Sequence, residues 1–328
     1  MSILEQSHRG KVYEAVHDEA LARLRTLLDV PASHDILLLQ GGAHLQFAML
    51  PLCFLPKDKT ADYIVNGGWG EKALEEAQVV GNARAAHTTL EGGSYVRTSR
   101  DAELSVTPGA AYVHYTTNET VHGVQYRSVP SVGGAPLVAD MSSDILSRAI
   151  DFTKHAFIYA GAQKNIGPSG IVVVIADKAF LAKGRRDLPK MLRYDVHAEN
   201  RSLYNTPPTF SIYLMRNVLA HLEAQGGLPA IQAANAMKAK TIYDVVDALP
   251  DFYRGPVEAG SRSEMNVVFR LPDEALEARF VKEAEAARLV GLKGHRSVGG
   301  IRVSLYNAVA LPSAQLLADF MRAFAAKA

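Results

Sequence analysis

The sequence predicts an α/β fold, with a mostly parallel central sheet covered by helices on both faces and a smaller C-terminal α+β domain. Short apolar runs alternate with segments of helical spacing along most of the chain. Strands that are apolar throughout are typical of parallel sheets buried on both faces. The pattern changes in the last third of the chain, which predicts the second domain. We place the large domain at residues 1–229 and the small domain at residues 230–328.

Hydrophobic periodicity indicates the individual elements. The first helix is marked by apolar residues on one face, Val12, Val16, Leu24, Leu27 and Leu28, and ends before Pro31. Strand-like runs follow at 36–39, 63–65, 112–115, 137–139, 157–160 and 171–175, with helical candidates between several of them at 44–55, 68–80 and 142–150. Two long helical stretches, 209–225 and 229–248, precede a strand at 266–269, a helix near 273–289, a strand at 301–306 and a terminal helix from about 313.

Composition excludes several classes of function. The chain has 328 residues, with 35 Lys and Arg against 34 Asp and Glu, so no overall basic field favours nucleic acid or an anionic membrane. The single cysteine, Cys53, excludes an intrachain disulfide framework and a cysteine-rich metal site, and we expect no bound metal. The N-terminal stretch lacks the apolar core of a signal peptide, and no run of 18 apolar residues follows. We therefore expect a cytoplasmic protein.

The most informative stretch is FIYAGAQKNIGPSG, residues 157–170, where an apolar run breaks into a polar, glycine-rich turn containing Lys164. A lysine just past a buried strand loses hydration unless its charge is removed, which favours a lysine that forms an imine with a carbonyl compound. A solvated lysine on a surface turn is the structural alternative.

Three other features lie where strands are expected to end, the edge at which open α/β sheets bind ligands. Gly41 and Gly42 allow a tight turn into a helix whose free N–H groups would face an anion. Trp69, in NGGWGEK, could stack on a flat ring, and Asp140, in LVADMSS, could hold a protonated pyridine nitrogen. Each has a structural alternative: a plain turn, a core tryptophan and a helix N-cap.

Together these residues make up the parts of a pyridoxal 5′-phosphate site. Lys164 would form the imine, Asp140 would hold the ring nitrogen, Trp69 would cover the ring face, and a helix start would bind the phosphate. Neither GxxxxGK[ST] nor GxGxxG occurs, so a nucleoside triphosphate or dinucleotide site has no motif support.

The chain also resembles the phosphoserine aminotransferases, fold-type I pyridoxal-phosphate enzymes of the class-V group, along essentially its whole length. The segments that carry the resemblance are SHRGKVYEAV, LQGGAHLQFAMLPL, HYTTNETVHGV, VADMSSDILSR, IYAGAQKNIGPSG, YNTPPTFSIY and GLKGHRSVGGIRVSLYNA. Seven matches in order make the resemblance specific.

The resemblance implies roles for individual residues. Lys164 is the Schiff-base lysine, Asp140 the partner of the ring nitrogen and Trp69 the stacking aromatic. Around the cofactor it implies further contacts from Ala43, His44, Thr120 and Gln163, with His44 standing where members commonly carry serine or arginine. Asn205 and Thr206 in YNTPP correspond to residues that reach the phosphate of the neighbouring subunit's cofactor, which implies a homodimer with shared active sites.

A basic cluster near the C-terminus indicates an anionic substrate. His295, Arg296 and Arg302 lie close in sequence, and on an extended segment the two arginines, an even number of residues apart, would point the same way. Guanidinium groups suit carboxylates and phosphates. The resemblance implies that Arg302 holds the α-carboxylate, and that His295, Arg296 and Arg9 receive the phosphate of phosphoserine or the distal carboxylate of glutamate. A solvated basic strand is the structural alternative.

The implied activity is a ping-pong transamination between L-glutamate and 3-phosphohydroxypyruvate, giving 2-oxoglutarate and O-phospho-L-serine on the route to serine. In some bacteria the family also aminates a related substrate on the route to pyridoxine. The family carries a further segment, with a Ser-Gly-Pro stretch, ahead of the position of MSILEQSHRG. The alternatives are a dimer that binds the cofactor with impaired catalysis, a glyoxylate aminotransferase of the same branch, and a cysteine desulfurase. The last would need a reactive cysteine on a mobile loop, whereas Cys53 lies in the apolar segment AMLPLCFLP, which we expect to be buried.

Overall fold

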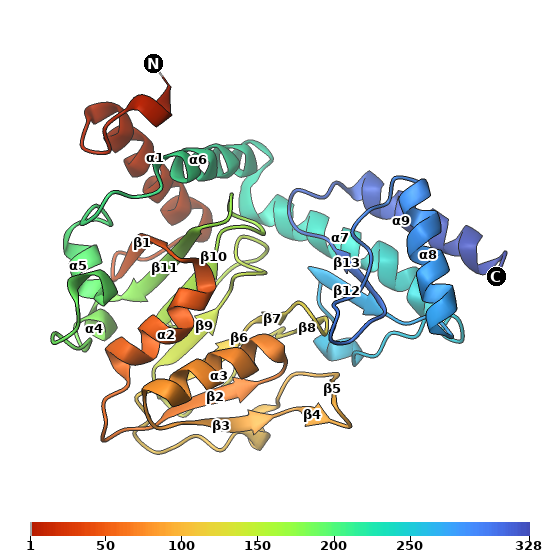
Figure 1. Ribbon diagram of the computed structural model, residues 1–328, viewed down its shortest axis with the longest axis horizontal. Coiled ribbons are helices and arrows are strands. Elements are labelled where there is room, and N and C mark those ends of the chain that lie inside the picture. Colours follow the sequence, from red (N-terminus) through yellow and green to blue (C-terminus); the bar gives the residue numbers. More distant parts are fainter. Residues whose placement is uncertain (1) are drawn as a thin grey trace.

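The computed structural model describes residues 2–328 and contains a large α/β domain with a smaller domain beside it (Figure 1). The large domain is built on a seven-stranded sheet in the order β1-β11-β10-β9-β6-β2-β3. Its strands are β1 (His34–Gln40), β2 (Ala61–Val65), β3 (Ala83–Thr88), β6 (Tyr112–Thr116), β9 (Leu137–Asp140), β10 (Phe157–Gly161) and β11 (Ile171–Asp177). Only β11 runs against the others, since it is antiparallel to both β1 and β10. The predicted mostly parallel sheet is confirmed.

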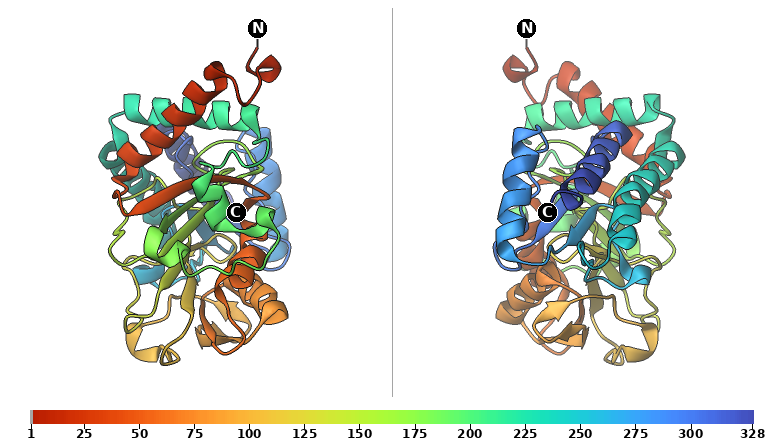
Figure 2. Two further views of the ribbon diagram at one scale, coloured as in Figure 1. Left: turned by 90° about the vertical axis from the view of Figure 1, so that its left-hand side faces the viewer. Right: turned by 90° about the vertical axis from the view of Figure 1, so that its right-hand side faces the viewer.

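Helices cover both faces of this sheet because its strands are apolar on both sides. One face packs under α1 (Lys11–Leu28) and α6 (Thr209–Ala224), which lie against each other (Figure 2). The other face packs under α2 (Gly42–Phe54) and α3 (Gly68–Val80), with α4 (Lys178–Leu181) and α5 (Tyr194–Glu199) at its edge. The helices expected near 44–55 and 68–80 are therefore present, and β3 was not anticipated.

The small domain is an α+β unit with its own apolar core. Helix α7 (Gly227–Ala248) leads into it, and β12 (Asn266–Phe269) pairs antiparallel with β13 (Ile301–Ser304). Helices α8 (Glu274–Ala286) and α9 (Leu311–Ala325) share one apolar core with these two strands. Ile231 of α7 packs in the large core and Ile242 in the small one. The boundary at 229/230 stays a prediction, because α7 runs across it.

Two short hairpins stand beside the main sheet. They are β4 (Leu90–Glu91) with β5 (Ser94–Tyr95), and β7 (Asn118–Glu119) with β8 (Val124–Gln125). The second hairpin follows β6 directly, so it lies at the carboxyl end of the sheet. None of the helices between residues 2 and 328 is long and apolar enough to span a membrane.

The helix predicted at 142–150 is wrong, since this segment consists of turns. Its carbonyl groups bond to other parts of the chain: Ile145 O accepts from Asn165 Nδ2 at 3.0 Å, and Leu146 O accepts from Asn307 Nδ2 at 2.9 Å. Leu146 also has a left-handed backbone, with φ of 60°, which an α-helix does not tolerate. Tertiary hydrogen bonds therefore override the helical spacing of the sequence.

Candidate active site

Lys164 lies in the turn that follows β10, at the edge of the large sheet. Burial lowers the pKa of its ammonium, while the carboxylates of Asp140 and Glu119 act in the opposite direction. Its Nζ lies 5.7 Å from the centroid of the Trp69 ring. A partly buried amine of this kind loses its proton more readily than a surface lysine, as an imine-forming group requires.

Asp140 ends β9, the strand that pairs in parallel with β10. Its side chain is buried, and one oxygen, Oδ1, accepts a hydrogen bond from Ser142 N at 2.8 Å. Burial raises the pKa of this carboxyl, against the influence of Ser142 and the Lys164 ammonium. Ser142 in turn accepts from Gly161 N at 2.9 Å. The two strand ends that carry Asp140 and Lys164 are thus joined directly.

The start of α2 forms a third side of the site, next to the end of β9 and the turn after β10. Gly41 and Gly42 have φ of 89° and 62°, a region open to glycine without steric cost. No side chain caps this helix, so its first N–H groups are free to face an anion. His44 in the first turn lies edge-on to Trp69, with ring centroids 5.7 Å apart.

These elements enclose one cavity of about 330 Å³. Of the residues predicted to touch the cofactor, its lining contains Ala43, His44, Trp69, Asp140, Gln163 and Lys164. The cavity has a buried carboxylate, an amine of lowered pKa, an aromatic face and an uncapped helix start. The residues present therefore fit pyridoxal phosphate.

The remaining predicted cofactor residues stand outside that lining. Thr120 lies beside it, because its Oγ1 accepts a hydrogen bond from Trp69 Nε1 at 2.9 Å. Asn205 and Thr206 lie in the irregular segment before α6, where Thr206 O accepts from Gln40 Nε2 at 3.0 Å. Their predicted reach into a neighbouring subunit stays a prediction.

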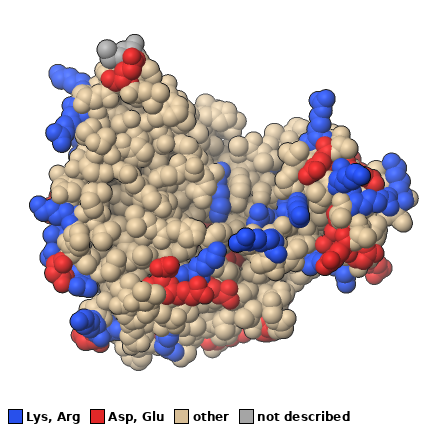
Figure 3. Space-filling view, in the orientation of Figure 1, with Lys and Arg blue, Asp and Glu red and all other residues tan. Residues whose placement is uncertain are grey.

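The predicted substrate residues form a basic rim in the small domain. His295 and Arg302 line a pocket of about 170 Å³ together with His122 and Arg270, and Arg296 joins His295 in an adjoining hollow. Burial and the neighbouring Arg302, Arg296 and Lys72 lower the pKa of His295. Figure 3 shows Lys and Arg side chains gathered along the hollow between the two domains.

One expectation about the basic residues is wrong, and another stays a prediction. Arg296 sits in a turn, and β13 begins only at Ile301, so strand alternation does not relate the direction of its side chain to that of Arg302. Arg9 precedes α1 and is exposed. Its backbone N donates to Ser7 Oγ, and it does not line the pockets that contain His295 and Arg302, so its predicted contact with the substrate stays a prediction.

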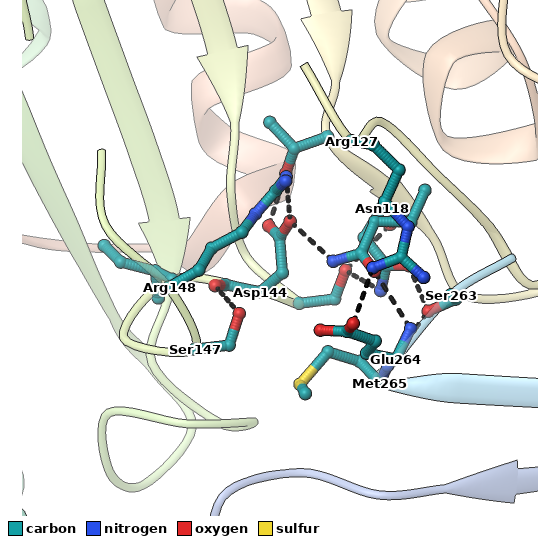
Figure 4. Close-up of polar contacts among 12 residues, drawn as sticks. Asn118, Arg127, Asp144, Ser147, Arg148, Ser263, Glu264 and Met265 are labelled. Carbon is teal, nitrogen blue, oxygen red and sulfur yellow. Dashed lines mark hydrogen bonds and ion pairs between the residues drawn. The ribbon is translucent and has the colours of Figure 1, made fainter. Parts of the chain in front are cut away.

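Sequence reasoning missed a polar network that joins the two domains (Figure 4). Asn118 of β7 donates to Asn266 Oδ1 at 3.0 Å and accepts from Ser263 Oγ at 2.6 Å. Asp144 accepts from Gln125 Nε2 at 3.1 Å and forms an ion pair with Arg148. Asn118 and Asp144 belong to the family segments HYTTNETVHGV and VADMSSDILSR. The partners of Asn118 in the small domain, Ser263 and Asn266, are remote in sequence, so the contact between the domains is not visible in these segments.

Comparison with known proteins gives consistent matches over nearly the whole chain. The family profile of class-V aminotransferases matches residues 2–315. The phosphoserine aminotransferase of Niallia circulans is 50% identical over 324 residues, which cover 99% of this chain and 89% of that protein.

Solved structures agree. The phosphoserine aminotransferase from Bacillus circulans subsp. alkalophilus superposes with a TM-score of 0.97 at 50% identity, covering 100% of this chain and 90% of that one. The PLP-bound phosphoserine aminotransferase from Trichomonas vaginalis gives a TM-score of 0.93 at 37% identity, covering 98% and 91%.

Proposed function

The chain belongs to the class-V aminotransferase family and, within it, to the phosphoserine aminotransferases, and from this premise we propose how its residues serve the reaction. The cavity beside Lys164 holds pyridoxal 5′-phosphate. The amino group of L-glutamate is transferred to 3-phosphohydroxypyruvate, giving 2-oxoglutarate and O-phospho-L-serine on the route to serine. The observation that carries this proposal is the meeting of Lys164, Asp140 and Trp69 around one cavity.

Each residue has a task that follows from its surroundings. Pyridoxal phosphate, when bound, supplies a ring that accepts the electron density released at the substrate's α-carbon. Lys164, with its lowered pKa, binds the cofactor and moves a proton from and to the substrate's α-carbon. Asp140, a buried carboxylate, holds a proton on the ring nitrogen. Ala43, His44 and Gln163 would surround the phosphate at the start of α2.

The basic rim selects the substrate. Arg302 would hold the α-carboxylate, since a guanidinium binds a carboxylate through two parallel hydrogen bonds. Arg302 lies close enough to Lys164 to contribute to lowering its pKa, which supports this assignment. His295 and Arg296 would receive the phosphate of phosphoserine or the distal carboxylate of glutamate.

A cytoplasmic homodimer completes the proposal. Asn205 and Thr206 are not among the residues that line the cavity of their own chain, which is compatible with contacts to a partner's site. Mixing two inactive variants tests this: Lys164→Ala subunits carry intact Asn205 and Thr206, and Asn205→Ala/Thr206→Ala subunits carry intact Lys164. Hybrid dimers should regain part of the activity. Sites confined to one chain would regain none.

The first test of the reaction is the visible absorption spectrum with pyridoxal phosphate, followed by glutamate and, separately, O-phosphoserine. We expect a band of lysine-bound cofactor that is absent in Lys164→Ala and that both amino donors convert to the pyridoxamine form. A band that neither donor converts would instead favour the cofactor-binding dimer with impaired catalysis.

A cysteine desulfurase is not supported. Cys53 is buried in α2, burial raises the pKa of its thiol to about 12, and its Sγ donates to Leu192 O at 2.9 Å. A thiol held in this way is not a nucleophile at neutral pH.

A further inference from the structure

Trp69, the one tryptophan of the chain, is held at two points by consecutive residues of a single hairpin. Its backbone N donates to Glu119 Oε2 at 3.0 Å, and its indole Nε1 donates to Thr120 Oγ1 at 2.9 Å. One bond fixes the start of α3 and the other fixes the ring. Together they set the plane of the indole at the edge of the cavity.

Glu119 also replaces the missing cap of α3. The N-cap position is Gly67, which has no side chain to accept a hydrogen bond. Glu119 Oε1 accepts from Gly70 N at 2.8 Å, so its carboxylate takes two of the free N–H groups of the first turn. The free N–H groups at this end of a helix favour a negative charge, whereas burial opposes it and raises the pKa of Glu119 to about 7. The side chain is only 1% exposed, so the bonds are shielded from water.

The glycines before and after Trp69 leave room for this carboxylate. A Cβ on Gly67 would stand 2.4 Å from Glu119 Cδ, and one on Gly70 would stand 3.3 Å from Oε1. Gly67 has φ of 167°, extended backbone that any residue adopts, so space explains the glycine. The glycines of NGGWGEK therefore leave space for the side chain of Glu119, which is 50 residues away from Trp69 in the sequence.

The hairpin that carries Glu119 is itself anchored on both sides. Asn118, the preceding residue, bonds to Ser263 and Asn266 of the small domain (Figure 4). The charges of Asp140 and Lys164 both influence the pKa of Glu119, which places its carboxylate near the chemical centre. The position of Trp69 is therefore tied to the cavity floor and to the joint between the domains.

We propose that Glu119 is a positioning residue for the reaction: it holds Trp69 in the plane that receives the cofactor ring. The inference rests on the proposed stacking of that ring on Trp69. Glu119 touches neither substrate nor cofactor in this account. It acts through the backbone of α3 and, by way of its neighbour Thr120, through the orientation of the indole.

The test compares Glu119→Gln with Glu76→Gln, the same exchange at an exposed position of α3, the helix whose start Glu119 binds. Glutamine keeps the size but turns an NH₂ group toward one of the two backbone donors. Because Trp69 is the only tryptophan, its fluorescence reports on this site alone. In the cofactor-free Glu119→Gln protein we expect lower anisotropy and a red-shifted emission. The dissociation constant for pyridoxal phosphate should rise by about tenfold, while Glu76→Gln behaves as the unmodified protein.

Anisotropy and cofactor affinity that match the Glu76→Gln control would overturn the inference, even if the thermal midpoint falls, because a purely structural role changes stability without loosening the indole of the folded protein. Should Glu119→Gln not fold, Gly67→Ala takes its place, since the added methyl displaces the carboxylate while keeping the glutamate, and the same two readouts decide. An unmodified protein that binds pyridoxal phosphate without quenching Trp69 would overturn the ring placement and this inference together. Normal quenching with an unaltered variant overturns the inference alone.

Discussion

The two sides of the active site are built differently. The cofactor side consists of buried side chains at strand ends and a helix start, where Asp140 and Glu119 are 5% and 1% exposed. The substrate side is a turn and a short strand of the small domain, on which Arg296 is exposed and His295 is half-buried. Buried groups interact strongly and tolerate little change, whereas exposed charges are screened by water and salt. The cofactor side should therefore control the chemistry, and the rim should control selectivity.

Loss of Lys164 should have the largest effect. We expect Lys164→Ala to lower kcat by on the order of 10³-fold or more, because it removes the group that we propose binds the cofactor and moves the proton. Single-turnover conversion of glutamate by the cofactor-loaded protein measures this. A loss of tenfold or less would mean that another base moves the proton. It would contradict the expectation that the cofactor side controls the chemistry.

The pH dependence of stability tests the buried side without reference to activity. Burial raises the pKa of Glu119 from 4.5 to about 7, so between these values the folded protein keeps a proton that the unfolded chain loses. The contribution of Glu119 to stability should therefore fall as pH rises from about 4.5 to about 7, by about 3 kcal/mol, and stay constant above.

Urea unfolding of the cofactor-free protein across this range, compared with Glu119→Gln, isolates the change. The difference in unfolding free energy between the two proteins should drift with pH in that window and level off above it. Parallel pH curves for the two proteins would contradict the raised pKa and would show that Glu119 is ionised in the folded protein throughout this range. Asp140 and Lys164 would then affect the pKa of Glu119 differently from what the structure indicates.

The substrate side should respond through KM. Arg302→Lys keeps the positive charge but replaces a planar fork by a single ammonium. We expect KM for O-phosphoserine and for glutamate to rise by about tenfold, with kcat little changed, measured in steady state for each amino donor. A fall in kcat with constant KM would place Arg302 in the chemical step, against the division of labour between the two sides.

Much of this division could be predicted from the sequence, because strand ends and motifs are local signals. The apolar runs and the glycines around Lys164, Asp140 and Trp69 predict that the three residues belong to one site, and they do line one cavity. One prediction that is wrong, a helix at residues 142–150, fails because of contacts between remote segments. Residues 142–150 have helical spacing, yet Asn165 and Asn307 bind the carbonyls of Ile145 and Leu146.

The position of Glu119 is a contact that the sequence does not predict. In the sequence, the family segment HYTTNETVHGV indicates Thr120, and NGGWGEK indicates Trp69. That the glutamate of one fills the space left by the glycine of the other follows only from the fold, which brings β7 against the start of α3. The turn at Arg296 likewise depends on where β13 begins, which alternation in the sequence does not specify.

Arg296 should give the smallest effect and the sharpest comparison with Arg302. Its side chain is exposed in a turn, where an ion pair contributes on the order of 1 kcal/mol or less. We expect Arg296→Gln to raise KM for O-phosphoserine by about threefold at low salt and to leave alanine, an amino donor without a distal anion, unaffected. Because exposed charges are screened, the difference should shrink as salt is raised toward 1 M, as a KM series in sodium chloride would measure. An effect that equals that of Arg302→Lys and persists in high salt would mean that substrate binding closes the rim and buries Arg296, which would make the two sides of the site alike in the closed state.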